Sequence, residues 1–471
     1  MDYEKLNNLD KKFVWHPYTQ MKEYNQKNNL IIEKGVGNYL IDINGNKYLD
    51  VTSSIWCNLL GHSNENIKNA IKNQIDKICH STLLGSANVP SILLAEKVIN
   101  NVVPKHLKKV FYSEDGSEAV EIALKMAFEY CWLKDNKKIK RTKFISVKEG
   151  YHGDTIGSMS VGGSETFHGM FKPLLFSGYF AETPYCYRCK FNNNYKDTDE
   201  RNNSKCNMKC LENMLNLIEQ HKDELFCVIL EGGVMGSAGI IPYPEGYITE
   251  VAKLCKKYNI IFILDEVATY GRLGDYLYSN NEELQKLEKP DIITIGKGIT
   301  GGYLPLALTI TTDEIYNQFL GDFEQCIQFF HGHTYTGNQL LCVSALATLN
   351  EIENKKIFDK NSNNRSNNNI NNKINYLHKS LDKLKKLNNV GDIRKKGFMT
   401  CIELVKDKST KEPYEYNFKA GYKVADELLK EGIYLRPIFN NLIIIPPLTI
   451  TYEEIDYLVN KLEYCINKVL K

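Results

Sequence analysis

Two kinds of hydrophobic pattern run along the chain, one with a period of two residues and one with the helical period. Residues 37–51, GNYLIDINGNKYLDV, carry two alternating apolar runs on either side of Asn44-Gly45, a dipeptide suited to the positive φ angles of a tight turn. This stretch predicts a β-hairpin. Apolar residues recur at the helical period over 64–79 and over 116–134, so both stretches predict helices.

Short apolar runs typical of buried strands alternate with helical patterns through the middle of the chain. A helical pattern at 246–258 is one example. The predicted strands are KFISV at 143–147, FCVILEG at 226–232, IIFILDEV at 260–267, DIITIG at 291–296 and LALTITT at 306–312. Buried strands that alternate with helices are typical of parallel sheets covered by helices. The sequence therefore predicts an α/β fold with a mostly parallel central sheet, to which LALTITT is a returning strand.

The last part of the chain has a different pattern. Helical and strand-like segments follow one another at 338–353, 374–387, 390–405, 418–431 and 442–448. An asparagine-rich tract at 360–373 interrupts them, and because it has little apolar surface to bury, we expect a surface insertion. The expected organisation is a large domain over 61–335, a small α+β domain over 336–471, and an N-terminal segment, 1–60, that joins the small domain.

Composition and charge argue against several classes of protein. The chain of 471 residues is 43% hydrophobic and 25% charged, with a net charge of +2. Balanced charge without an arginine-rich groove argues against nucleic acid or an anionic membrane as a partner. The first residues, MDYEKLNNLDKKF, lack the apolar core of a secretion signal, and the longest apolar runs are too short to cross a bilayer. We therefore expect a cytoplasmic protein whose 13 cysteines are reduced.

Four segments carry chemically useful groups where predicted strands end. In DIITIGKGITGG, Lys297 follows a strand and stands between two glycines. Asp265 ends the strand in FILDEV, Tyr151 follows KFISV in GYHGDT, and Gly116-Ser117 begin the helix that follows VFYS. Each feature also has a plain structural interpretation: a solvated lysine in a surface turn, a strand-end cap, a half-buried loop tyrosine and a helix N-cap.

All four groups are expected at the carboxyl ends of the strands, where open α/β sheets bind their ligands. An amine, a carboxylate, an aromatic ring and a helix N-terminus that attracts anions together describe one ligand, pyridoxal 5′-phosphate. Lys297 would form a Schiff base with it, and Asp265 would keep its ring nitrogen protonated. Tyr151 would stack on the ring and Gly116-Ser117 would bind the phosphate. No GxxxxGK[ST] pattern occurs, so a nucleoside triphosphate is not the expected anion.

Five segments resemble the motifs of one enzyme family. DGSEAVEIALKMA, GYHGDT, LDEVAT, GKGITGGYLP and HGHTYTGNQL occur in the order found in class III (ω-type) pyridoxal-phosphate aminotransferases, and the likeness covers nearly the whole chain. The resemblance implies the PLP-dependent transferase fold type I. It implies the roles given above to the four strand-end groups and makes Lys297 the acid and base of a proton shift. It also implies that Thr334 contacts the phosphate of a neighbouring subunit, and hence a homodimer with shared active sites.

Three further segments resemble the branch of this family that converts 8-amino-7-oxononanoate to 7,8-diaminononanoate in biotin synthesis. They are WHPYTQMKEY at 15–24, SSIWCNLLGH at 53–62 and LRPIFNNLIIIPP at 435–447. The resemblance implies that Arg436 binds the substrate carboxylate, which suits the planar fork of donors on arginine. It also implies that a further set of residues lies at the substrate pocket: Tyr18, Trp56, Asp154, Arg272 and His333.

The resemblance leaves the amino donor open between S-adenosylmethionine and L-lysine. The S-adenosylmethionine-dependent type usually has two tryptophans after the serine pair, whereas Ile55 precedes Trp56 here. This difference, together with the likeness of HGHTYTGNQL and GKGITGGYLP to the lysine-dependent type, favours lysine. We expect two half-reactions, in which the donor leaves its amine on the cofactor and the ketone of the small-molecule acceptor then takes it.

Three positions depart from the family pattern. Met235 stands where the family has a glutamine able to hydrogen-bond the ring hydroxyl. The usual GFGRTG is one residue shorter, YGRLG, around Arg272, and Asp115 precedes Gly116 in place of serine, which puts a carboxylate near the expected phosphate. These departures leave open reduced activity or a different substrate. The alternatives are another ω-amino acid or diamine aminotransferase, an aminomutase, a decarboxylase, a racemase, or a dimeric cofactor-binding scaffold without activity.

Residues 185–210 form a cysteine-rich insertion. Cys186 and Cys189 have CxxC spacing, and Cys206 and Cys210 have CxxxC spacing. Four thiolates in a polar loop suit tetrahedral zinc or an iron–sulfur cluster. The alternative, which the unusual second spacing favours, is a variable loop whose thiols bind no metal.

Overall fold

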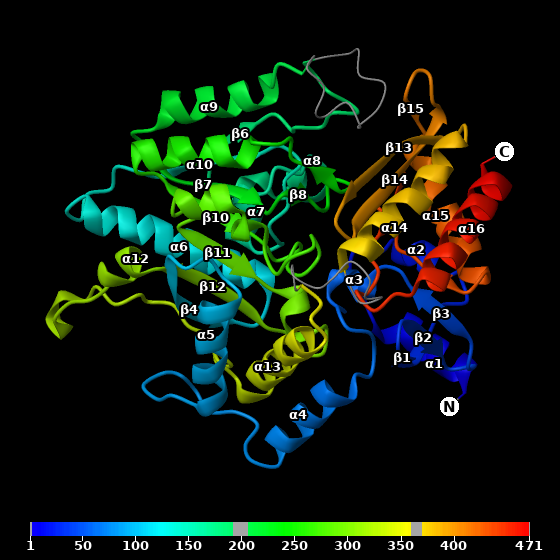
Figure 1. Ribbon diagram of the computed structural model, residues 1–471, viewed down its shortest axis with the longest axis horizontal. Helices are drawn as coiled ribbons and strands as arrows, with labels where there is room; N and C mark the ends of the chain where they lie inside the picture. Colours follow the sequence, from blue (N-terminus) through cyan, green and yellow to red (C-terminus); the bar gives the residue numbers. More distant parts are fainter. Residues whose placement is uncertain (1, 192–205, 359–369, 471) are drawn as a thin grey trace.

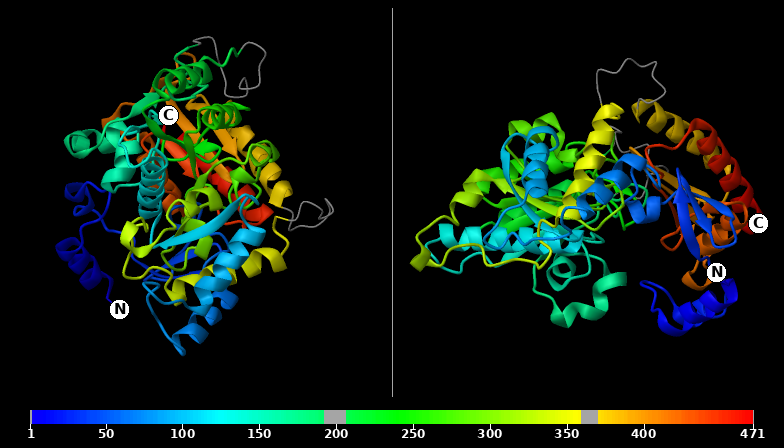
Figure 2. Two further views of the ribbon diagram at one scale, coloured as in Figure 1. Left: turned by 90° about the vertical axis from the view of Figure 1, so that its left-hand side faces the viewer. Right: turned by 90° about the horizontal axis from the view of Figure 1, so that it is seen from below.

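The computed structural model describes residues 2–191, 206–358 and 370–470. Elements from the middle of the chain gather around one large sheet, and elements from both ends of the chain gather around smaller sheets beside it (Figure 1). The blue N-terminal strands therefore lie next to the orange and red C-terminal elements, as the further views also show (Figure 2).

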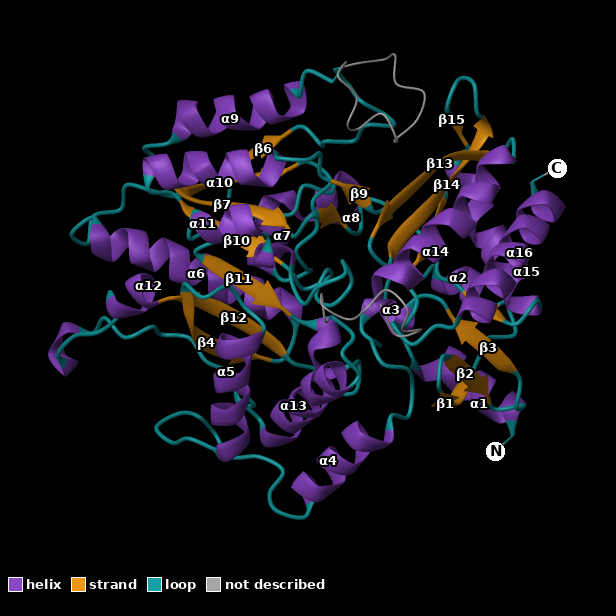
Figure 3. Cartoon of the chain, in the orientation of Figure 1, coloured by secondary structure: helices purple, strands orange, loops and turns teal. Residues whose placement is uncertain are grey.

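A seven-stranded sheet organises the middle of the chain (Figure 3). Strand β12 pairs antiparallel with both of its neighbours, and the pairs among the strands from β11 to β6 are parallel. This confirms the predicted, mostly parallel α/β sheet with a returning strand. In spatial order the strands are β4 (Leu107–Ser113), β12 (Ala307–Thr312), β11 (Ile292–Ile295), β10 (Ile261–Asp265), β7 (Leu225–Glu231), β5 (Lys143–Val147) and β6 (Tyr179–Ala181).

Helices pack against this sheet. α6 (Gly116–Lys134) contacts β11 and β12 and coincides with the helix predicted over 116–134. α4 (Glu65–Ile75) ends four residues before residue 79, the predicted end of that helix. The others in this part of the chain are α5 (Val89–Asn101), α7 (Ile156–Val161), α8 (Glu165–His168), α9 (Lys209–His221), α10 (Tyr247–Tyr258), α11 (Glu282–Lys286), α12 (Asp313–Asn317) and α13 (Gln339–Asn354).

Two four-stranded sheets form the second group of elements. The first contains β1 (Ile32–Val36), β2 (Tyr39–Asp42), β3 (Lys47–Asp50) and β16 (Ile433–Tyr434), and its β2–β3 hairpin turns at Asn44-Gly45 as predicted. β3 pairs parallel with β16, so the N-terminal segment completes a sheet with a strand from the C-terminal part. The second sheet contains β13 (Val390–Lys396), β14 (Met399–Asp407), β15 (Glu412–Pro413) and β17 (Asn441–Ile444).

The helices of this second group include the one that follows the asparagine-rich tract. They are α1 (Tyr3–Phe13), α2 (Met21–Tyr24), α3 (Ser53–Trp56), α14 (Ile370–Asp382), α15 (Ala420–Lys430) and α16 (Tyr452–Val469). Because α14 begins at Ile370, the end of the predicted insertion is helical, which corrects its boundary; residues 359–369 lie outside the described part. The domain limits at 60/61 and 335/336 stay predictions. In the described ranges, every helix is too short or too polar to cross a membrane.

Polar residues at or next to the ends of three neighbouring strands of the large sheet lie level with one another. Asp265, the last residue of β10, is paired with Glu231 on β7 and with Thr294 on β11. This register gathers polar side chains at the carboxyl edge of a sheet whose strands bury mainly apolar residues.

Candidate functional site

The predicted strand-end groups meet at one cavity of about 730 Å³. It lies at the carboxyl edge of the large sheet, where the backbone leaves β4, β5, β10 and β11. Among the residues that line it are Gly116, Ser117, Tyr151, Asp265, Lys297, Trp56 and Asp154. The sequence prediction that these residues share one site therefore agrees with their positions.

Lys297 points into this cavity from a strained backbone position. Its φ is 44°, in the left-handed region, and its Nζ lies 4.9 Å from the centre of the Trp56 ring. Burial lowers the pKa of Lys297 below the usual 10.5, and the carboxylates of Asp265 and Glu231 only partly oppose this shift. The amine is therefore neutral over a wider pH range than that of a solvated lysine.

Asp265 is held by three donors. The Nδ1 of His152 lies 2.8 Å from its Oδ2, while the Val267 N–H and the Thr294 hydroxyl donate to its Oδ1 at 3.0 and 2.9 Å. A buried carboxylate requires such partners. Neither His152 nor Thr294 was predicted from the sequence, although His152 directly follows Tyr151 in GYHGDT.

A second buried carboxylate, Glu231, was also missed. It accepts hydrogen bonds from the Gly236 N–H at 2.7 Å and the Tyr151 N–H at 3.2 Å. Burial raises the pKa of Glu231 to about 7. This side chain links the loop that carries Tyr151 to the end of β7.

The N-terminus of α6 provides an anion site. Asp115 is the N-cap: its carboxylate accepts from the Glu118 N–H at 3.0 Å, and Glu118 in turn accepts from the Glu114 and Asp115 N–H groups at 3.0 and 3.3 Å. The first N–H groups of a helix lack partners within it, which leaves those of Gly116 and Ser117 for a ligand. Asp115 thus serves as the N-cap of α6, a role that serine also fills.

Asp154 gathers the aromatic side chains at the mouth of the cavity. It accepts hydrogen bonds from the hydroxyls of Tyr18 at 2.7 Å and Tyr151 at 2.9 Å, and His168 Nε2 lies 3.2 Å away. Burial alone would raise the pKa of Asp154, but these three hydrogen bonds outweigh it and lower the pKa. An ionised Asp154 therefore fixes the orientation of Tyr151.

A second cavity, of about 530 Å³, adjoins the first. Four residues line both cavities: Trp56, Tyr151, Ser237 and Lys297. Tyr18 and Arg436 line only the second. The two cavities thus form one path from the amine of Lys297 to the guanidinium of Arg436, and aromatic side chains line this path.

A family model for class III aminotransferases matches residues 20–466. The chain belongs to the class III aminotransferase family. It is 64% identical, over 99% of both chains, to the adenosylmethionine-8-amino-7-oxononanoate aminotransferase of Methanocaldococcus jannaschii. It is 44% identical to the enzyme of the same name from Aquifex aeolicus, over 100% of this chain and 99% of that one.

Solved structures agree with the family assignment. The crystal structure of the Methanocaldococcus jannaschii enzyme superposes with a TM-score of 0.91 at 61% identity, covering 99% of both chains. An (S)-enantioselective ω-transaminase from Thermomicrobium roseum superposes with a TM-score of 0.88 at 29% identity, over 100% of both chains. The class III aminotransferase therefore has PLP-dependent fold type I, as predicted.

Class III aminotransferases use pyridoxal phosphate, and the first cavity of this aminotransferase fits that cofactor. A buried amine whose pKa is lowered, a fixed carboxylate and helix N–H groups without a partner in the helix face the same space. These are the groups that an aldehyde, a pyridinium nitrogen and a phosphate require.

Two residues predicted at the substrate pocket lie elsewhere. The buried guanidinium of Arg272 donates to the carbonyls of Trp56, Asn58 and Pro446 at 3.2, 3.0 and 2.8 Å, and Arg272 lines neither cavity. His333 Nδ1 lies 3.1 Å from Glu114 and 3.3 Å from Glu118, also outside both cavities of its own chain. Because backbone carbonyls occupy its donors, Arg272 is placed to support the chain around Trp56, a supporting role that the resemblance also suggested for it.

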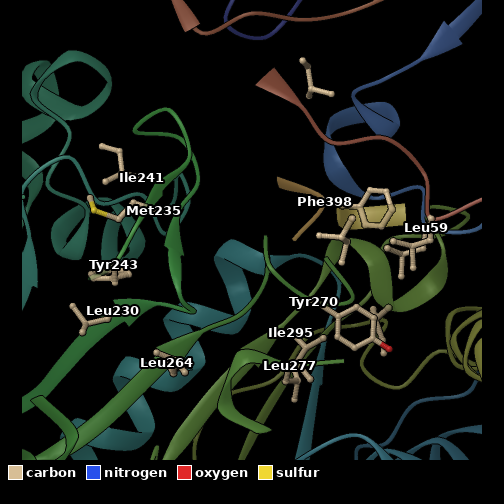
Figure 4. Packing of buried hydrophobic residues seen from close by; sticks show 14 of the residues in the cluster. Leu59, Leu230, Met235, Ile241, Tyr243, Leu264, Tyr270, Leu277, Ile295 and Phe398 are labelled. Atoms are coloured by element: carbon tan, nitrogen blue, oxygen red, sulfur yellow. The ribbon is translucent and has the colours of Figure 1, made fainter. Parts of the chain in front are cut away.

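Met235 does not reach the cofactor cavity. Its side chain is fully buried among apolar residues and lies between Ile241 and Tyr243 (Figure 4). Met235 therefore packs in the core and forms no part of the wall of the cavity.

Thr334 and the cysteines also lie away from the two cavities. Thr334 is exposed, and its carbonyl accepts from His80 Nε2 at 2.9 Å. Cys186 and Cys189 flank a tight turn, and Cys210 is buried in the first turn of α9; residues 192–205 lie outside the described part. Within the described residues, the one group of three potential metal ligands within 4.8 Å of one another is Glu114, Glu118 and His333. Burial, together with the nearby Cys206 and Cys189, raises the pKa of Cys210 to about 11, so these three thiols lie near one another without forming such a group.

Proposed function

We propose that this class III aminotransferase transfers an amino group to 8-amino-7-oxononanoate and so makes 7,8-diaminononanoate for biotin synthesis. The observation that carries the proposal is the path between Lys297 and Arg436, in a chain that is 64% identical to a relative of that name. Arg436 suits the carboxylate of the oxo acid, since a guanidinium binds both carboxylate oxygens at once. The apolar wall of Trp56 suits the methylene chain between the two reacting ends.

We propose S-adenosylmethionine as the amino donor. The names of the relatives from Methanocaldococcus jannaschii and Aquifex aeolicus support this choice. These names weigh against L-lysine. Lysine was favoured by Ile55 and by the resemblance of HGHTYTGNQL and GKGITGGYLP to the lysine-dependent type.

The residues of the first cavity have separate proposed roles. Pyridoxal phosphate, when bound, supplies an electron sink that weakens the C–H bond of the substrate amine carbon. The Nζ of Lys297, whose pKa burial lowers, would take that proton from the donor carbon and pass it to the cofactor in the first half-reaction. In the second half-reaction the same amine would move a proton from the cofactor to the acceptor carbon. Asp265 stabilises positive charge at the ring nitrogen, and Tyr151, held by Asp154, covers the ring. Gly116 and Ser117 bind the phosphate.

The proposed assembly is a homodimer in which each subunit completes the other's site. The segment around Thr334 exposes several large apolar side chains: Leu320, Phe323, Phe330 and Tyr335. Exposed apolar groups in one continuous segment are typical of protein interfaces. We propose that a second copy covers this segment and receives Thr334 at its phosphate site.

The experiment that tests the function is a direct assay. Purified protein is incubated with 8-amino-7-oxononanoate and either S-adenosylmethionine or lysine, and 7,8-diaminononanoate is measured by mass spectrometry. Product with S-adenosylmethionine supports both parts of the proposal, and product with lysine alone overturns the donor. No product with either donor favours an aminomutase, decarboxylase, racemase or inactive scaffold.

Borohydride reduction tests the site independently of the substrate. It should fix the cofactor to the peptide that contains Lys297, and a cofactor found on another lysine would overturn the assigned role.

A cytoplasmic location stays a prediction. Zinc or iron–sulfur binding at Cys186, Cys189, Cys206 and Cys210 stays a hypothesis, which metal analysis of protein purified without oxygen would test.

A further inference from the structure

Residues 53–56 form a left-handed helical turn. The φ angles of Ser53, Ser54, Ile55 and Trp56 are 47°, 49°, 65° and 69°, and the Trp56 N–H donates to the Thr52 carbonyl at 2.8 Å. Side chains of L-residues clash with the backbone in this conformation, so that only glycine, or a single asparagine or aspartate, adopts it readily. None of the four is glycine, and Ile55 is β-branched. The surrounding structure must therefore hold the turn in place.

Asp50 holds the start of the turn. Its carboxylate is fully buried at the end of β3 and accepts from the Thr52 N–H at 3.2 Å, the Thr52 hydroxyl at 3.1 Å and the Ser54 hydroxyl at 3.0 Å. His62 Nε2 lies 3.0 Å from the same carboxylate. Four polar contacts on one buried carboxylate fix the direction in which the backbone enters the turn.

Two further contacts hold the rest of the turn. The Ser53 hydroxyl donates to the Ile445 carbonyl at 2.6 Å, and the guanidinium of Arg272 donates to the Trp56 carbonyl at 3.2 Å. Residues 53–56 are thus tied to Asp50, Arg272 and Ile445, through two serine hydroxyls and the Trp56 carbonyl.

The turn presents two adjacent side chains to the cavities. Ile55 lines the second cavity and is 42% exposed, whereas Trp56 lines both cavities and lies over Lys297. A Cβ on Gly236 would come within 2.9 Å of Trp56 Cζ3, so the opposite wall leaves room for the indole only because residue 236 is glycine. Any other backbone path through 53–56 would point these side chains elsewhere.

We propose that Asp50 is a positioning residue: it holds the left-handed turn, and the turn makes Ile55 and Trp56 a wall that admits a slender, unbranched aliphatic acid between Lys297 and Arg436. This inference rests on the proposed function, since it concerns the acceptor of that reaction. Asp50 lines neither cavity and acts through the backbone of the turn.

Kinetics of two variants with a matched control test the proposal. Asp50→Asn and Ser54→Ala should raise KM for 8-amino-7-oxononanoate, by about tenfold for Asp50→Asn, while kcat changes by less than about threefold. The control is Ser63→Ala, because Ser63 also has a positive φ, 60°, and donates to the Gly35 carbonyl at 2.6 Å, but lines neither cavity. The control should match the wild type. An unchanged KM in Asp50→Asn, or a loss of bound cofactor equal to the loss of activity, would overturn the proposal.

A second pair of variants needs neither substrate nor Asp50. Glycine adopts φ near 65° without strain and alanine does not, so Ile55→Gly should melt at or above the temperature of Ile55→Ala, the reverse of their usual order in helices. A melting temperature of Ile55→Gly several degrees below that of Ile55→Ala would show that the turn is not strained and would overturn the inference. If wild-type protein has no turnover with the oxo acid, the proposed function fails, whereas this comparison still decides whether the turn is strained.

Discussion

The Nδ1 atom of His152 lies 2.8 Å from Oδ2 of Asp265, and both side chains are buried. Because His152 directly follows Tyr151, one short loop after β5 supplies both the ring proposed to cover the cofactor and the partner of the carboxylate beneath it. Asp265 can then neither rotate nor exchange its partner for water.

Replacing His152 by phenylalanine should leave one buried oxygen of Asp265 without a donor. An unsatisfied buried partner of this kind costs about 1–3 kcal/mol, so kcat/KM should fall about 10- to 100-fold. His152→Asn, whose amide can still donate, should recover part of the loss. The measurements are steady-state rates and the absorption spectrum of the bound cofactor. Rates equal to those of the wild type in His152→Phe would contradict this role.

The pH dependence of cofactor capture should report the environment of Lys297. Only a neutral amine attacks an aldehyde, and burial lowers the pKa of Lys297 from 10.5. The rate at which cofactor-free enzyme binds pyridoxal phosphate covalently should therefore rise with pH and level off at a lower pH than for a solvated lysine peptide. Stopped-flow absorbance follows the reaction, with Lys297→Ala as the control that shows no covalent phase. Coincident pH profiles of the protein and the peptide would contradict the prediction.

Mixed dimers should reveal whether two subunits share each site. Lys297→Ala homodimers should be almost inactive, and Thr334→Ala homodimers should bind the cofactor weakly. A heterodimer of the two, isolated through different affinity tags, combines both defects in one site and leaves the other intact, so it should regain about half of wild-type activity. Activity no greater than the average of the two homodimers would argue against shared sites.

Glu231 should make the protein less stable as the pH rises. Burial raises the pKa of Glu231 from 4.5 to about 7, so the folded protein binds the proton more tightly than the unfolded chain. The contribution of protonated Glu231 to the free energy of unfolding is fully present below pH 4.5 and is lost as the pH rises to about 7. Between these values the wild type should lose about 1–3 kcal/mol of unfolding free energy relative to Glu231→Gln. Urea unfolding at a series of pH values measures this difference, and parallel curves would exclude it.

Much of the site was predictable because strand ends can be read from apolar runs. Lys297, Asp265 and Tyr151 each follow such a run, and the topology of a parallel sheet brings the carboxyl ends of its strands together. The level ends of Glu231, Asp265 and Thr294 were not predictable, since the register between strands depends on packing that a single sequence does not display.

Other features were missed for different reasons. Helix α16 has a regular apolar face, formed by Ile455, Leu458, Val459, Leu462 and Ile466, and could have been found from its period. The turn at 53–56 had no such signal, because isoleucine and tryptophan disfavour its conformation. The position of Met235 in the core was missed because a resemblance between motifs gives the residue but not the direction of its side chain.

The pairing of β3 with β16 joins residues that are nearly four hundred positions apart in the sequence, such as Leu49 and Ile433. The first hairpin therefore leaves the ribosome long before its partner strand exists, while the large sheet can close as soon as β12 has been made. Asp50 belongs to this late pairing, beside Tyr434. A nascent enzyme would thus fix the wall formed by Ile55 and Trp56 only in a late stage of folding, once β16 has left the ribosome.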